Sequence, residues 1–236
     1  MKSFVQELIA VIAICILSLA ATAVKGQEKN SGSYSIYTKE NIIQTDTFEI
    51  IPGTSYVDEI KGVSAGETDR RFELLLENGR FQSLEKKVNG IVETSVKLEK
   101  GVFSFYEKTA MVAAVPDENN SPVFEAAAYS NYALLANFYD RRKGGKQTLA
   151  VMIPALQDLI NVEMEQHGTD GFTVGEQTLT ATHYRMAVGK KRETVNLWVE
   201  NNRVIAIYTA SNNRFIIDNA FPQLYDRVKQ VINKAM

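Results

Sequence analysis

The chain has 236 residues, with 26 basic and 28 acidic side chains, and its formal net charge at neutral pH is −2. A near-neutral chain without a basic tail lacks the positive surface that nucleic-acid binding requires, so we expect no nucleic-acid partner. Hydrophobic residues make up 45% of the chain, which is enough for a sizeable core.

The first 26 residues have the features of a secretory signal peptide. Lys2 gives a positive start, an apolar run covers residues 8–23, and small residues offer cleavage after Ala23 or after Gly26. The run of about 16 residues is shorter than the roughly 20 that a spanning helix needs. We therefore expect a periplasmic or secreted protein that does not span a membrane after cleavage, although contact with a membrane stays open. An uncleaved anchor is the alternative, because Glu7 dilutes the positive charge.

Cleavage would remove Cys15, the only cysteine, and leave 24 basic and 27 acidic side chains. The remaining chain of about 210 residues suits one domain. A domain of this size does not depend on disulfides for stability. We expect residues 27–33 to be a flexible polar lead-in and residues 34–236 to form a single domain.

The first half of the domain is predicted to consist of strands separated by tight turns. Asn78-Gly79 and Asn89-Gly90 are strong hairpin signals, because both positions of a type I′ turn require positive φ. With Lys100-Gly101 they predict an antiparallel meander of four strands. The expected strands are 34–38, 42–51, 56–61, 72–76, 80–88, 91–98 and 102–106.

A helix is predicted over residues 123–140, after a loop at 116–122. Apolar residues in this range fall near helical spacing and alanine is frequent. The cations and glycines of residues 141–145 are typical of a helix C-terminus.

Strand patterns resume in the last third of the chain, with a turn predicted at residues 169–171. The expected strands are 147–153, 156–166, 178–188, 194–200, 203–210 and 214–217. A final helix is predicted from Pro222, since proline suits a first helical turn and Leu224, Val228 and Val231 form an apolar stripe. The predicted fold class is mostly β (α+β): an antiparallel curved sheet or unclosed β-barrel with one central helix and a C-terminal helix.

No catalytic motif is present in the sequence. A serine-nucleophile elbow and a phosphate-binding loop are both missing. His167 and His183 have no cysteine or carboxylate at metal-ligand spacing, so we expect no metal, no cofactor and no catalytic residue. An acid/base pair of carboxylates from distant segments remains an alternative, and a cleft holding two carboxyl groups with opposed pKa shifts would favour it.

Two segments of the C-terminal half resemble a known family. Residues 172–186 are similar to the glycine-then-strand element of certain bacterial periplasmic domains, ending in Tyr184-Arg185. Residues 194–207 are similar to the Trp-containing hairpin that follows it. These domains resemble the lipoprotein-carrier family. The resemblance implies an unclosed antiparallel barrel curled around a helix, with an apolar concave face that binds acyl chains.

We therefore expect an exported, non-enzymatic cell-envelope protein that holds a lipid or other apolar ligand on a concave sheet face. An envelope interaction or assembly protein without a small ligand is the alternative, and a hydrolase is the third hypothesis. The strands that would line a cavity supply the candidate ligand-binding residues: Phe72, Leu74, Leu76, Tyr184, Met186, Val195, Leu197 and Val199.

Overall fold

The computed structural model describes residues 30–51, 53–62, 68–117, 120–189 and 193–235. The predicted signal peptide therefore lies outside the described residues. Within the described ranges, neither helix has the length and apolar character needed to cross a membrane.

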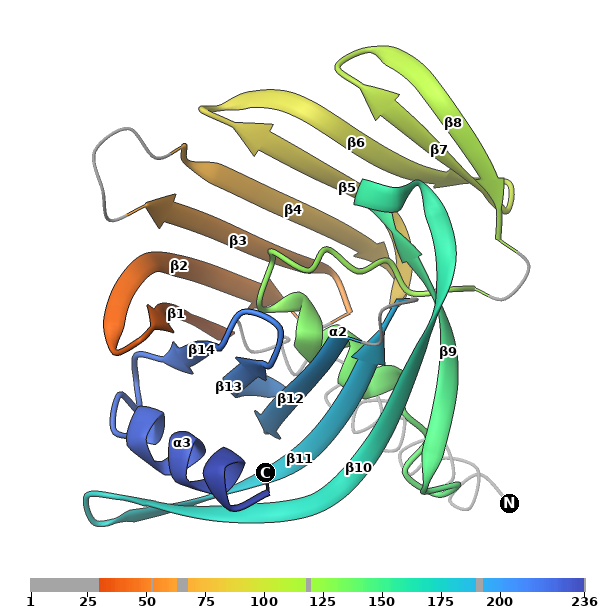
Figure 1. Ribbon diagram of the computed structural model, residues 1–236. Helices are drawn as coiled ribbons and strands as arrows, with labels where there is room; N and C mark the ends of the chain where they lie inside the picture. The colour runs from red at the N-terminus through yellow and green to blue at the C-terminus, as the bar shows by residue number, and fades with distance from the viewer. Residues whose placement is uncertain (1–29, 52, 63–67, 118–119, 190–192, 236) are drawn as a thin grey trace, which may run out of the picture.

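The predicted fold class is confirmed, because 14 antiparallel strands form one curved, unclosed sheet (Figure 1). Its strand order is β8-β7-β6-β5-β4-β3-β2-β1-β14-β13-β12-β11-β10-β9. Each strand in the two halves of the chain pairs with its sequence neighbour. The two halves meet where β1 pairs with β14, with Tyr34 opposite Asp218 and Thr38 opposite Arg214.

The N-terminal half is a continuous meander. Its strands are β1 (Asn30–Thr38), β2 (Asn41–Ile51), β3 (Ser55–Gly62), β4 (Arg70–Glu77), β5 (Arg80–Val88), β6 (Ile91–Glu99), β7 (Val102–Glu107) and β8 (Ala110–Pro116). The predicted turns at Asn78-Gly79 and Asn89-Gly90 are confirmed, and all four residues have positive φ. Strand β1 begins earlier than expected because Asn30 pairs with Ile50 of β2. Strand β8 was not predicted, since its small apolar residues do not alternate with polar ones.

The C-terminal half comprises β9 (Lys146–Ile153), the short helix η1 (Pro154–Leu156), β10 (Asp158–Val174), β11 (Gln177–Val188), β12 (Glu193–Glu200), β13 (Arg203–Thr209) and β14 (Arg214–Asp218). The prediction of a turn at residues 169–171 was wrong. Strand β10 runs through this range and pairs with β11 as far as Val174. The register of this pairing shifts between Gln166 and Gly168, just before the predicted turn.

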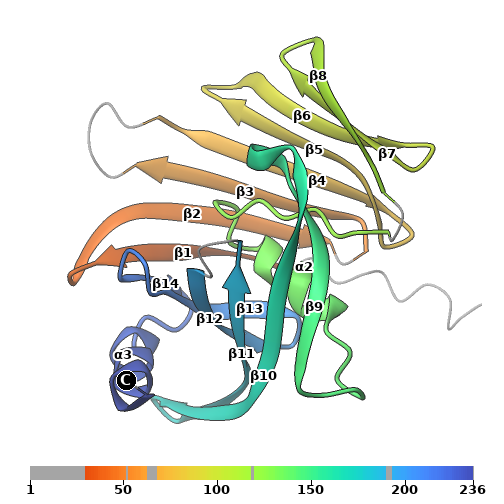
Figure 2. The same ribbon diagram turned by 45° about the vertical axis from the view of Figure 1, so that its right-hand side comes forward.

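The crossover from β8 to β9 places helix α2 (Asn131–Phe138) inside the curve of the sheet (Figures 1 and 2). The helix is shorter than the predicted range 123–140. Its first part pairs with β9 instead: the Met152 N–H donates to the Pro122 oxygen, and the Phe124 N–H donates to the Met152 oxygen, both at 2.9 Å. Pairing with a sheet edge therefore overrides the helix propensity of this segment.

Helix α3 (Leu224–Ala235) packs on the opposite, outer face of the sheet. Leu224, Val228 and Ile232 are buried there, together with Trp198 and Ala206 of the sheet. The predicted C-terminal helix is thus confirmed. The molecule has a large inner core around α2 and a smaller outer core beneath α3.

Candidate functional site

The eight sequence-predicted ligand-binding residues all belong to the inner core. Each is buried, with an exposed fraction of 8% or less. Side chains of α2, among them Tyr132 and Leu135, belong to the same cluster. The helix and the crossover therefore occupy the part of the concave face that the sequence predicted as cavity lining.

An apolar pocket of about 90 Å³ opens at one end of this core. One predicted residue, Leu76, lines it. The other apolar walls come from segments that the fold brings together: β5 and β6, the crossover and α2. They are Phe81, Leu98, Val123, Leu134 and Phe138. Phe138 is 38% exposed, so its ring lies at the surface as well as against the pocket.

Four polar side chains, Arg80, Asp117, Asn120 and Ser121, also line this apolar pocket. The Asp117 carboxylate accepts a hydrogen bond from the Ser121 N–H at 3.0 Å. The Ser121 hydroxyl is buried and has no hydrogen-bond partner among the described residues. This site was not predicted from the sequence. It forms only because the crossover folds back over β4–β6, and no local sequence pattern indicates that arrangement.

Two buried carboxyl groups lie on the inner face beside α2. Asp46 of β2 and Asp58 of β3 are both fully buried. Burial, followed by the charge of Asp58, raises the pKa of Asp46 far above its ordinary value, so Asp46 is protonated at neutral pH. Burial also raises the pKa of Asp58, while hydrogen bonds from Asp46 and Ser130 act in the opposite direction. A protonated Asp46 can therefore act as the donor to Asp58.

Asp58 connects the sheet to the start of α2. Its Oδ1 accepts the Ser130 N–H at 2.9 Å, and its Oδ2 accepts the Ser130 hydroxyl at 2.5 Å. A carboxylate at a helix N-terminus is favoured by the free N–H groups and the helix dipole. The pair differs from the acid/base site considered for a hydrolase, because both pKa values are raised and both carboxyl groups are sealed from solvent. Asp46, Phe48 and Ile50 are spaced two residues apart, so they lie on the same face of strand β2. This spacing is the sequence signal that places Asp46 on the inner face.

His183 takes part in a structural cluster near α3. Its ring stacks on Trp198 with centroids 4.4 Å apart. Its Nδ1 lies 3.3 Å from Asp170 Oδ2, which also accepts the Trp198 Nε1–H at 2.7 Å. Burial lowers the pKa of His183, which favours the neutral ring. No cluster of three or more His, Cys, Asp or Glu suited to a metal occurs in the part of the chain that the structure describes.

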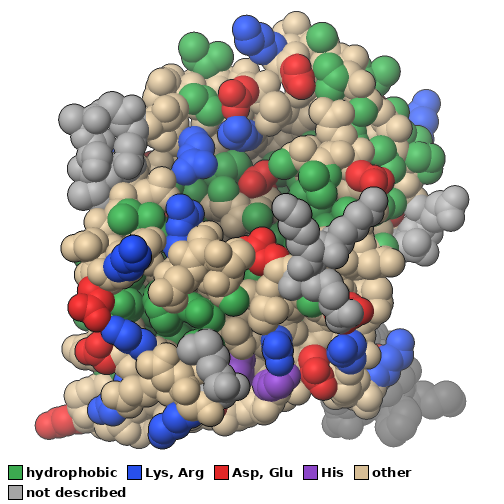
Figure 3. All heavy atoms as spheres, viewed as in Figure 1, with side chains coloured by type: hydrophobic (Ala, Val, Ile, Leu, Met, Phe, Trp, Pro, Cys, Tyr) green, Lys and Arg blue, Asp and Glu red, His purple; other side chains and the backbone are tan. Residues whose placement is uncertain are grey.

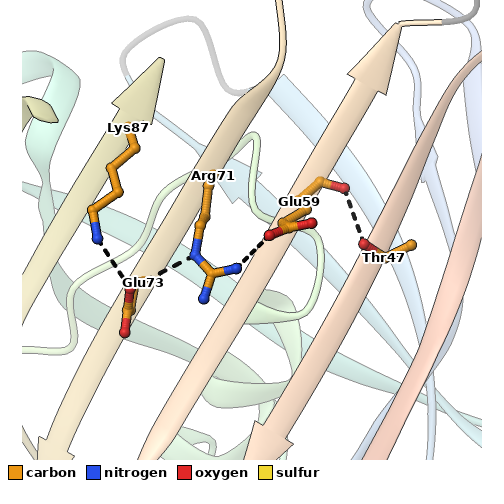
Figure 4. A network of polar contacts seen from close by, with 5 residues as sticks. All are labelled: Thr47, Glu59, Arg71, Glu73 and Lys87. Carbon is orange, nitrogen blue, oxygen red and sulfur yellow. Dashed lines mark hydrogen bonds and ion pairs between the residues drawn. The ribbon is translucent and has the colours of Figure 1, made fainter. Parts of the chain in front are cut away.

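The outer face of β2–β5 carries a ladder of polar contacts (Figure 4). Arg71 pairs with Glu59 and lies 3.7 Å from Glu73, and Lys87 lies 3.4 Å from Glu73. Acidic and basic side chains alternate across the strands and are partly solvent-exposed. The ladder therefore neutralises itself and does not form a patch of one sign.

Comparison with protein-family models, curated proteins and solved structures gave no match.

Proposed function

We propose that this protein is an exported, non-enzymatic binding protein that holds an apolar group, such as the end of a lipid acyl chain. The observation that carries the proposal is the apolar pocket beside the crossover. Its walls are mainly leucine, valine and phenylalanine, with a few polar groups, which is the usual composition of a small-molecule site. The unclosed sheet around a helix also fits the carrier resemblance, but as an analogy of fold alone.

The size of the pocket limits what it can hold. A single water needs about 10–15 Å³ of comparable volume, so about 90 Å³ accommodates a short run of methylene groups rather than a whole lipid. Each buried methylene contributes about 0.8 kcal/mol. A few of them suffice for reversible binding, and the remainder of a longer ligand would lie outside, past Phe138.

Titration of the mature protein with a fluorescent fatty acid tests this proposal. We expect saturable binding by the wild type and at least about tenfold weaker binding by Leu98→Phe, which fills the pocket with extra volume. Leu75→Phe is the matched control, since Leu75 is 41% exposed and does not line the pocket. Thermal unfolding checks that both variants are folded. Absence of binding by the wild type, or equal binding by the two variants, would refute the proposal.

The open edge of β8 favours a second function, contact with another protein chain. At the opposite edge, β9 pairs with the crossover at Met152, whereas the described residues place no strand beyond β8. Strand β8 has no charged residue, and Met111 and Val112 are 62% and 45% exposed. Hydrophobic side chains reach the surface over β7 and β8 (Figure 3). Natural proteins usually protect such edges.

The occupant we infer for this edge is a second copy of the chain, paired β8 to β8 in antiparallel orientation. Two uncharged strands can approach without like-charge repulsion, and a two-fold axis makes the contact self-complementary. Sedimentation over a wide concentration range should show a dimer that Met111→Lys abolishes. Ile91→Lys should leave the dimer intact, because Ile91 is similarly exposed but starts β6. A monomeric wild type at all concentrations would exclude this second function.

A further inference from the structure

We propose that the ligand of the apolar pocket is an amphiphile with an anionic head group, a carboxylate or a phosphate, and that Arg80 holds its charge. This inference rests on the proposed binding function and adds the chemical class of the ligand. It depends on three features of the pocket lining, as the described residues show them: a cation without an ion pair, a carboxylate that already accepts a hydrogen bond, and a buried hydroxyl without a partner.

The backbone of Arg80 is positioned by the sheet, and its side chain has no counter-ion among the described residues. Arg80 is the first residue of β5, directly after the Asn78-Gly79 turn, and its backbone pairs with Glu77. Arg71 and Lys87 on the same two strands are ion-paired. By contrast, no carboxylate of the described residues pairs with the Arg80 side chain. A guanidinium at the rim of an apolar pocket matches carboxylate and phosphate oxygens in geometry as well as in charge.

Asp117, the other charged residue of the lining, is already engaged with the protein. Its carboxylate accepts the Ser121 N–H, and its own N–H donates to the Gly101 oxygen at 2.8 Å. These contacts hold the crossover against β6 and β7. The carboxylate thus has a structural role, and Arg80 is the charged group of the lining that remains to meet a ligand.

Ser121 supplies a second polar contact. The residue is only 4% exposed, and its buried hydroxyl lacks a partner among the described residues. A buried hydroxyl without a hydrogen bond is unfavourable, so a ligand oxygen that accepts from it gains binding energy. An amphiphile would place its chain among Leu76, Phe81 and Leu98 and its oxygens toward Ser121 and Arg80.

The test compares ligands that share a chain and differ in the head group. A neutral fluorescent probe, N-phenyl-1-naphthylamine, is bound first and then displaced by dodecanoate, dodecyl phosphate or dodecanol. We expect at least one anion to bind the wild type about fivefold more tightly than dodecanol, the upper range for a partly exposed ion pair. The anion that binds more tightly identifies the head group.

Arg80→Gln should weaken binding of the anions more than binding of dodecanol, and so remove this preference. Arg71→Gln is the matched control, because it removes the same charge from the outer face of β4 and should retain the preference. Equal binding of all three ligands by the wild type, or equal loss of preference in both variants, would overturn the inference and leave the binding function standing. Failure of the wild type to bind the probe and every ligand would instead refute the binding function itself.

Discussion

At the scale of single residues, the inner core contains acidic groups whose pKa values are raised by burial. Asp46 and Asp58 are the clearest case, since both are fully buried and only one carries the acceptor role toward α2. A buried carboxyl group avoids the cost of its charge by keeping its proton. The two residues are therefore chemically similar but are expected to respond differently to the same substitution.

Replacement of each aspartate by asparagine should separate the two roles. In Asp46→Asn, the amide replaces the carboxyl proton as donor to Asp58, so we expect a change of less than about 1 kcal/mol in the free energy of unfolding. In Asp58→Asn, the charged acceptor of the Ser130 N–H and hydroxyl is lost, and we expect a loss of about 1.5–3 kcal/mol. Urea unfolding measures both. Equal losses would contradict the assignment of donor and acceptor.

The same pair predicts a dependence of stability on pH. The pKa values of Asp46 and Asp58 are raised in the folded protein, whereas an unfolded aspartate has a pKa of about 3.9. Above pH 4 the folded state therefore binds more protons than the unfolded state, and stability falls as the pH rises. Urea unfolding at pH 7, 8 and 9 should show this decline, with a shallower slope for Asp46→Asn. This range avoids the titration of His183, which is neutral in both states there.

Arg203 and Asp218 form an ion pair next to β1, in which the Asp218 side chain is fully buried and the Arg203 side chain is 22% exposed. The Arg203 Nε and Nη2 donate to the two carboxylate oxygens at 2.5 and 2.7 Å. Gly32 makes room for the guanidinium, because a Cβ at this position would lie 2.7 Å from Nη2.

Arg203→Met should cost about 3–5 kcal/mol, since it leaves the Asp218 carboxylate buried without its cation. Arg71→Met removes an arginine from the outer ladder and should cost less than about 1 kcal/mol. Urea unfolding of the two variants measures the difference. Similar losses would show that the Arg203 pair is no more important than a surface pair.

At the scale of elements, the two helices differ in how well the sequence predicts them. Helix α3 was predicted because its apolar stripe repeats every three or four residues, and this stripe is the face that the sheet buries. Helix α2 was predicted too long, because Val123 and Phe124 pair with β9 and Ser130 meets Asp58. These partners are distant in sequence, so alanine content alone could not locate the start of the helix.

Leu224→Ala should test how much α3 contributes to stability. The side chain is fully buried in the outer core, and a leucine-to-alanine change in such a site costs about 2–5 kcal/mol. Arg227→Ala, on the exposed side of the same helix, should change stability by less than about 0.5 kcal/mol. Thermal or urea unfolding gives both values. A small effect of Leu224→Ala would mean that α3 is docked only loosely on the sheet.

At the scale of the whole molecule, the turn residues and the alternation of apolar and polar residues along the strands were enough to predict an antiparallel curved sheet. Asn-Gly turns defined the meander, and the clean alternation of β12 identified its inner face. The candidate pocket could not be predicted in this way, because Leu76 and Phe138 are brought together only by the long crossover between β8 and β9. The residues predicted to bind a ligand were consequently core side chains of the inner sheet face. Arg80 and Ser121, which line the pocket, were not among them.

The pairing of β1 with β14 has a consequence for biosynthesis. The two strands are separated by most of the chain, yet they form the middle of the sheet. Contacts between such distant segments form late and slow the folding of the chain. Because synthesis proceeds from the N-terminus, the free edge of β1 would remain available to wrong partners until β14 has emerged. A chain of this topology would therefore benefit from a chaperone that shields β1 until synthesis is complete.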